Sequence, residues 1–193
     1  MERWLKEGQD RVWRGARVLD IERGWDGKTA QIAKMELTSS LVVGKSVLDV
    51  GCGTGDLYRY LKKANKNVKY LGVDQSADML ERARERNPEA RFTQRNIYKM
   101  KDIPKFDTVV SLDVLHHQSA LEPGFSILMK HARKRLIITL HIAGKHYQHK
   151  GGRGEIITYH SHKDLEKKFA GIKHTHHRSV GYKWKDLYCF FLG

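Results

Sequence analysis

Residues 47–55, VLDVGCGTG, join a short apolar run to a glycine-rich turn, and the residues that follow have a helical pattern. A strand-to-helix turn of this kind needs positions without a Cβ, so that a ligand can approach the backbone closely. The helix after it offers unpaired N–H groups and a positive dipole end to an anionic group. Asp56 at the helix start would repel a pyrophosphate, so a zwitterionic ligand fits better, with Asp49 holding its ammonium group.

A second acid supports this interpretation of the turn. Asp74 ends the next apolar run, residues 70–74 (YLGVD), and lies 23 positions after Gly51. At that spacing a carboxylate lies beside the first turn, where it can accept both hydroxyls of a ribose. A Gly-x-Gly-x-Gly pattern alone is a weak signal. Together with Asp49 and Asp74 it predicts a site for a nucleoside-containing ligand.

Apolar runs and helical stretches alternate along the rest of the chain. We expect strands at residues 47–50, 70–74, 90–93, 106–112 and 136–140, and helices at residues 28–41, 57–65, 77–87, 121–131 and 161–169. Such alternation predicts an α/β fold, a doubly wound parallel sheet with helices on both faces. Residues 173–178 and 187–192 predict a hairpin at one edge. Residues 143–160 have no clear regular pattern, and long irregular segments are often functional.

Length and composition indicate one globular domain. The 193 residues divide into a helical N-terminal segment or lid (1–43), a cofactor-binding core (44–142), a substrate loop (143–160) and a C-terminal helix with edge strands (161–193). No apolar run approaches the roughly 20 residues that cross a bilayer. The first residues lack the apolar region of a secretory signal, and only two cysteines occur. We therefore predict a cytoplasmic protein without membrane contact.

The charge balance is unusual. There are 36 Lys and Arg against 22 Asp and Glu, a formal net charge of +14. Such a surplus concentrates anionic partners near the protein. Nucleic acid is one candidate, and a small phosphorylated or carboxylated molecule is another. The basic residues are spread along the chain rather than gathered in one block, so solubility alone is also a sufficient reason for them.

Several segments together resemble a known family. The strings VLDVGCGTG (47–55), GVDQS (72–76) and FDTVVSLDVLHH (106–117) are similar to the class I S-adenosylmethionine-dependent methyltransferases, within them the small methyltransferase-domain group. The resemblance runs from about residue 44 to 169. It implies a mostly parallel, seven-stranded Rossmann-like sheet whose last strand is antiparallel, with S-adenosyl-L-methionine bound over the first, second and fourth strands. A dinucleotide is the poorer alternative, because that fingerprint needs Gly at the position of Asp56.

The resemblance also implies the cofactor-binding residues. Around the methionine portion it places Asp49, Gly51, Cys52, Gly53 and Gly55. Asp74 matches the acid that holds the ribose hydroxyls, and the positions beside the adenosine and the sulfonium match Gln75, Met79, Asn96, Ile97, Leu112 and Asp113. Asn96 departs from the Asp that is common in the family, although an amide can still contact the adenine amino group.

The acceptor of a methyl group would lie where strands four and five end, in the crevice of an open α/β sheet. If the acceptor is a hydroxyl or a protonated amine, a base is needed there. The candidates are Asp113, His116, His117 and His141. A packing or positioning role is the alternative for each histidine. Tyr159 and His160 are further candidates for lining the site.

The chain has eleven histidines, which raises the question of a metal. His174 and His176 would point to the same face of a strand, as a ligand pair or as a polar edge. None of the histidine spacings matches a recognised ligand motif, and no cysteine pair accompanies them. We therefore predict no metal site.

Three functions fit these observations. The first is methyl transfer to an oxygen or nitrogen of a small, anionic acceptor. The second is a nucleic-acid methyltransferase that uses the basic surface, although the fourth strand has Ser111-Leu112-Asp113-Val114 rather than an Asn-Pro-Pro-Tyr motif. The third is a non-catalytic cofactor-binding partner, against which the intact glycine turn speaks. The residues do not indicate an oligomeric state.

Overall fold

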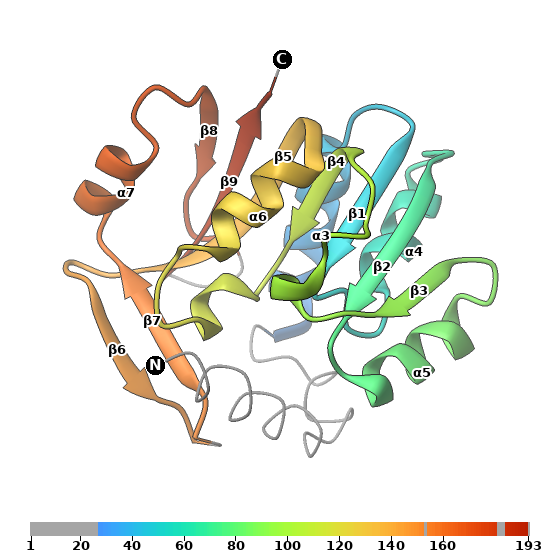
Figure 1. The fold of residues 1–193 in the computed structure, drawn as a ribbon, viewed down its shortest axis with the longest axis horizontal. Helices are drawn as coiled ribbons and strands as arrows, with labels where there is room; N and C mark the ends of the chain where they lie inside the picture. The colour runs from blue at the N-terminus through green and yellow to red at the C-terminus, as the bar shows by residue number, and fades with distance from the viewer. Residues whose placement is uncertain (1–26, 153, 181–183, 193) are drawn as a thin grey trace.

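A computed structural model describes residues 27–152, 154–180 and 184–192 of the chain. These residues form one nine-stranded sheet with helices on both faces (Figure 1). The predicted doubly wound α/β fold is therefore confirmed. Most of the expected N-terminal helical segment, residues 1–26, lies outside the described residues.

The strands and helices follow the alternation that the sequence predicts. The strands are β1 (Ser46–Val50), β2 (Lys69–Asp74), β3 (Arg91–Gln94), β4 (Phe106–Ser111), β5 (Ala132–Ile142), β6 (Tyr147–Lys150), β7 (Ile156–His160), β8 (His174–His177) and β9 (Lys185–Phe191). The α-helices are α3 (Gly27–Leu41), α4 (Asp56–Lys63), α5 (Ala77–Arg86), α6 (Gly124–His131) and α7 (His162–Lys168). Ser161 caps α7, because its hydroxyl accepts a hydrogen bond from the Asp164 N–H at 3.1 Å.

The sheet order explains where a ligand can bind. Five parallel strands run in the order β3-β2-β1-β4-β5, so the order reverses between β1 and β4. In open α/β sheets the crevice at such a reversal, outside the carboxyl ends of the strands, is the usual ligand site. β9 pairs antiparallel with β5 and with β8. This confirms both the antiparallel last strand and the predicted hairpin of the tail.

The segment 143–160 differs from the prediction. It is not irregular but contains the hairpin β6–β7, whose strands pair antiparallel. β7 joins the sheet through two residues, since His141 and Ile142 of β5 pair with Tyr159 and His160. Every residue of β6 is exposed, so this strand lacks the apolar face that makes a strand recognisable. The hairpin is also why the sheet has nine strands in the described residues, where the resemblance predicted seven.

The core consists of two apolar layers, one on each face of the sheet. Adjacent strand residues such as Leu187 and Tyr188 belong to opposite layers, because successive side chains of a strand point to opposite faces. The layer with Tyr188 includes residues of α6 and α7, and the layer with Leu187 includes α4. Figure 1 shows α6 crossing the front of the sheet while α3 and α4 lie behind it. No helix in the described ranges is long and apolar enough to span a membrane.

Candidate functional site

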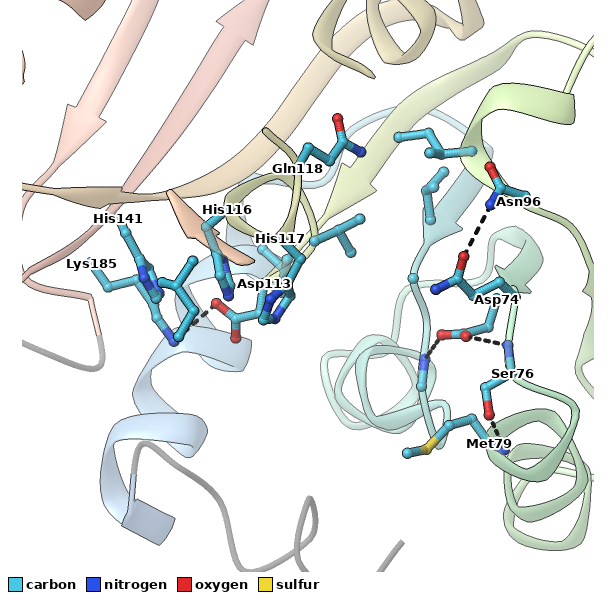
Figure 2. Close-up of a pocket in the computed structure, with 18 of the residues that line it drawn as sticks. Asp74, Ser76, Met79, Asn96, Asp113, His116, His117, Gln118, His141 and Lys185 are labelled. Atoms are coloured by element: carbon cyan, nitrogen blue, oxygen red, sulfur yellow. Dashed lines mark hydrogen bonds and ion pairs between the residues drawn. The ribbon is translucent and has the colours of Figure 1, made fainter. Parts of the chain in front are cut away.

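A cavity of about 500 Å³ lies at the carboxyl ends of β1, β2, β4 and β5. This volume is within the range of small-molecule and cofactor sites. Figure 2 shows two groups of polar side chains that line it: Asp74, Ser76 and Asn96 on one side, and Asp113, His116, His117, His141 and Lys185 on the other. The cavity thus has an acid-and-amide end and a histidine-and-lysine end.

The glycine-rich turn forms the wall between these ends. Gly51 and Gly53 line the cavity, both with positive φ, 76° and 52°. A Cβ at Gly51 would lie 2.1 Å from a methyl carbon of Val114, whereas no protein atom lies within 4 Å of a Cβ at Gly53. Gly51 is therefore required for packing at this turn, and Gly53 leaves open space beside the cavity.

Asp74 lies at the end of β2, and its carboxylate is fixed by the backbone. Oδ2 accepts a hydrogen bond from the Gly53 N–H at 2.9 Å, and Oδ1 accepts one from the Ser76 N–H at 2.9 Å. Burial raises the pKa of Asp74, although these N–H groups act in the opposite direction. Each oxygen keeps further lone pairs, so the carboxylate is held in position to accept hydrogen bonds from a ligand.

The remaining predicted adenosine contacts surround Asp74. The Asn96 amide donates to Gln75 Oε1 at 3.1 Å, and its own oxygen accepts from the Tyr98 N–H at 2.9 Å. Met79 and Ile97 are buried apolar residues of the same cavity wall. This end therefore combines two coupled amides with apolar side chains, a mixture typical of small-molecule sites.

Three of the predicted cofactor residues, Asp49, Cys52 and Gly55, are not among the residues that line the cavity. The Asp49 carboxyl is buried, and it accepts a hydrogen bond from the Tyr70 hydroxyl at 2.7 Å. Burial raises its pKa to about 7. Its predicted contact with an ammonium group stays a prediction. Leu112, by contrast, lines the cavity where β4 ends.

Asp113 follows β4 and is held in a strained conformation. Its φ is 59°, in a region that residues other than Gly rarely adopt. Its N–H donates a hydrogen bond to Thr139 Oγ1 at 2.7 Å. Its carboxylate forms ion pairs with two buried lysines, Lys34 of α3 and Lys185 of β9, the latter at 2.9 Å. Burial acts to raise the pKa of Asp113, but the two ammonium groups hold it well below its usual range. Asp113 is therefore an ionised carboxylate anchored by two lysines, and its catalytic role stays a prediction.

The three predicted histidines meet beside Asp113. The His116 and His141 rings are stacked with centroids 3.8 Å apart, and the His117 ring lies 4.0 Å from that of His116. Burial, followed by the neighbouring imidazoles, lowers the pKa of His116 well below its usual range, and burial also lowers that of His117. Both are therefore neutral at physiological pH. His116 Nδ1 is buried and has no hydrogen-bond partner among the described residues.

Several residues of this end were not predicted from the sequence. Lys34, Lys185, Gln31 and Trp184 line the cavity or pair with Asp113. Lys34 and Lys185 lie 79 and 72 positions from Asp113 in the chain, so no local pattern connects them to it.

Tyr159 lines the cavity as expected, and its ring centroid lies 5.2 Å from that of His141. His160 is buried elsewhere, with its ring centroid 5.4 Å from that of His146.

Parts of this chain are similar in sequence and fold to known proteins. Residues 48–136 match the family model of a methyltransferase domain. The fold resembles that of DesVI from Streptomyces venezuelae, with a TM-score of 0.66 and 18% identity over 91% of this chain and 97% of that one. The chain thus resembles methyltransferase domains over residues 48–136, and its fold is that of S-adenosylmethionine-dependent methyltransferases such as the one from Clostridium acetobutylicum, with a TM-score of 0.62 and 15% identity over 100% of this chain and 97% of that one.

Two curated relatives each match part of the chain. The trans-aconitate 2-methyltransferase of Rhodopseudomonas palustris (strain BisB5) is 30% identical over 97 residues, which are 50% of this chain and 37% of that protein. The malonyl-[acyl-carrier protein] O-methyltransferase of Pectobacterium atrosepticum is 41% identical over 69 residues, 36% of this chain and 25% of that protein. The matches thus span between a quarter and just over a third of these relatives' length.

Proposed function

We propose that this protein transfers a methyl group from S-adenosyl-L-methionine to an oxygen or nitrogen of a small anionic acceptor. The observation that carries the proposal is the single cavity that joins the Asp74 end to the histidine-and-lysine end. When bound, S-adenosylmethionine supplies a methyl group on a sulfonium. The open space beside Gly53 and the fixed carboxylate of Asp74 fit such a nucleoside.

Each end of the cavity then has its own task. Asp74 accepts the ribose hydroxyls, and Asn96, Gln75, Met79 and Ile97 surround the adenine. At the other end Asp113, fixed by two lysines, positions the side chains against which the acceptor lies. His116, whose Nδ1 has no hydrogen-bond partner among the described residues, is neutral and accepts the proton that an attacking hydroxyl or amine must lose, as a base that its lowered pKa makes weak. Enclosure by the histidines and Tyr159 excludes water from the reacting atoms.

The anionic character of the acceptor has two supports. The relatives named above are named for trans-aconitate and for a malonyl group, both of which carry carboxylates. A net charge of +14 over the whole chain acts in the same direction.

Methyl-labelled S-adenosylmethionine tests this proposal directly. Incubation with a cell extract separated into small acids, RNA and protein should label the small-acid fraction. Label in RNA alone would instead favour the nucleic-acid alternative, and no label in any fraction despite cofactor binding would favour a non-catalytic partner.

Separate His116→Ala, His117→Ala and His141→Ala variants then test the base. We expect His116→Ala to lower turnover by about 10²-fold or more, while affinity for S-adenosylhomocysteine changes little. Unchanged turnover in all three variants would remove histidine from the mechanism.

A further inference from the structure

A second cluster of ligand-type side chains lies away from the cavity, where α7 meets the edge strands. It consists of His162 at the start of α7, His176 of β8 and Asp186 of β9. None of the three lines the cavity. One donor atom from each lies within 4.8 Å of the other two. We propose that these residues form a binding site for a divalent transition-metal ion, with Zn²⁺ as its probe; the proposal does not depend on methyl transfer.

The distances suit one ion shared by three ligands. The Nε2 atoms of both histidines approach the same carboxylate oxygen, Asp186 Oδ2, at 2.7 Å for His176 and 3.6 Å for His162. Tetrahedral zinc with bonds of about 2.0–2.1 Å has ligand atoms roughly 3.3 Å apart, a value that lies between these two distances. The ion would take the place of the hydrogen now shared between His176 and Asp186.

The surrounding contacts hold the ligands in position. The other Asp186 oxygen, Oδ1, accepts a hydrogen bond from the Ser179 N–H at 2.9 Å, which fixes the orientation of the carboxylate. The His176 ring stacks on Tyr188, with centroids 4.5 Å apart and planes at 4°. Asp186 is buried, whereas the His162 side chain is 37% exposed and that of His176 24%. An ion can therefore enter from the solvent side and keep a water molecule as a further ligand.

Another cluster of ligand-type residues, in the cavity, differs from this one in its surrounding charge. Asp113, His116 and His141 also lie close enough for one ion, but two lysine ammonium groups already neutralise Asp113 and would repel a cation. No lysine or arginine of the described residues pairs with Asp186; its ion-pair partners there are His162 and His176. Two imidazoles and one carboxylate are a donor set suited to zinc and its neighbours in the first transition series.

The position of the cluster also suggests what the ion would do. Lys185 and Asp186 are adjacent on β9 and point to opposite faces of the sheet. Lys185 contacts Asp113 in the cavity, and Asp186 would hold the metal on the face that α7 covers. A bound ion would therefore tie α7 and β8 to the strand that supplies a lysine to the active-site carboxylate.

Metal titration of the tag-free, chelator-treated full chain tests the site. We expect one equivalent of Zn²⁺ to bind by calorimetry, and Co²⁺ to give the visible absorption of a low-symmetry site with nitrogen and oxygen ligands. His162→Ala and His176→Ala should each weaken Zn²⁺ binding by at least about tenfold. His174→Gln is the matched control, because His174 is on the same strand but bonds to the Ile172 carbonyl at 2.8 Å, and it should bind Zn²⁺ like the original chain.

Several outcomes would overturn the proposal. One is the absence of Zn²⁺ binding at 100 times the protein concentration. Another is unchanged Zn²⁺ affinity in the His162→Ala/His176→Ala double variant. Circular dichroism can confirm that this variant is folded. A loss of binding in His116→Gln but not in that double variant would place the ion in the cavity instead, and would equally reject the site on Asp186.

Discussion

Asp49 and Asp74, the two carboxylates beside the glycine-rich turn, differ in what their oxygens contact. Asp74 is held by two backbone N–H groups and faces the cavity, whereas Asp49 is buried against the Tyr70 hydroxyl. Both have raised pKa values because burial disfavours the charged form. Asp74 is therefore suited to contacting a ligand, whereas Asp49 lowers the stability of the fold when it ionises.

Asp74→Ala tests the ligand-binding role. A hydrogen bond to a charged group contributes about 1.5–3 kcal/mol, so the variant should bind S-adenosylhomocysteine about ten- to a hundredfold more weakly in calorimetry. Asp78→Ala, at an exposed position near the start of α5, is the control and should bind normally. Equal affinity of the two variants would exclude Asp74 from the ligand contacts.

Asp49→Asn tests the cost of the buried acid. The folded pKa of about 7 lies above the unfolded value, so this group's stabilisation is complete below pH 3.8 and is lost as the pH rises through 7. An amide does not ionise and can still accept the Tyr70 hydrogen bond. The free energy of unfolding should therefore rise by about 1–4 kcal/mol at pH 8 and change little near pH 4, as urea titration measures. A larger gain at pH 4 than at pH 8 would contradict this sign.

Among the elements, α3 contacts the candidate site through one buried charged side chain. The side chain of Lys34 is 1% exposed and pairs with Asp113, just after β4. Near the protein surface, Lys62 and Glu89 form a pair of the same type whose side chains are 58% and 45% exposed. The two pairs differ in solvation and in that Asp113 has a second lysine partner, Lys185.

Lys34→Met should therefore destabilise the protein more than Lys62→Met. The substitution leaves Asp113 with Lys185 as its partner, so the loss should be smaller than the about 3–5 kcal/mol of an uncompensated buried charge, yet larger than the about 0–1 kcal/mol that an exposed pair contributes. Urea unfolding of both variants measures the difference. Similar losses in the two would mean that Asp113 does not depend on Lys34.

The elements also show how far sequence reasoning reaches. The glycine turn and Asp74 were predictable because a strand, a turn and a helix in series carry their own local pattern. Lys34 and Lys185 were not, since their partner is distant in the chain and a lysine within a helix or before a strand usually faces solvent. β6 was missed because it has no apolar face, and Asp186 meets His162 and His176 only once α7 folds onto the edge hairpin.

At the scale of the whole molecule, buried histidines govern the response to acid. Burial lowers the pKa values of His116 and His117, and lowers that of His160 to about 4. Between the unfolded histidine pKa of about 6.5 and these lower values the unfolded chain binds more protons. Their contribution to stability is therefore complete above pH 6.5 and is lost as the pH falls.

His160→Gln should reduce this acid sensitivity. The free energy of unfolding of the original chain should fall more between pH 7 and pH 5 than that of the variant, because glutamine takes up no proton. Exposed His149→Gln is the control and should follow the original chain. A variant that loses more stability than the original chain over this interval would reverse the expected sign.

The central claim is that one cavity holds a sulfonium nucleoside between Asp74 and the histidines. A crystal structure with S-adenosylhomocysteine tests it most directly. We expect the ribose hydroxyls within hydrogen-bond distance of the Asp74 carboxylate and the sulfur directed toward Asp113 and His116. A ligand bound with its ribose away from Asp74, or outside this cavity, would contradict the account.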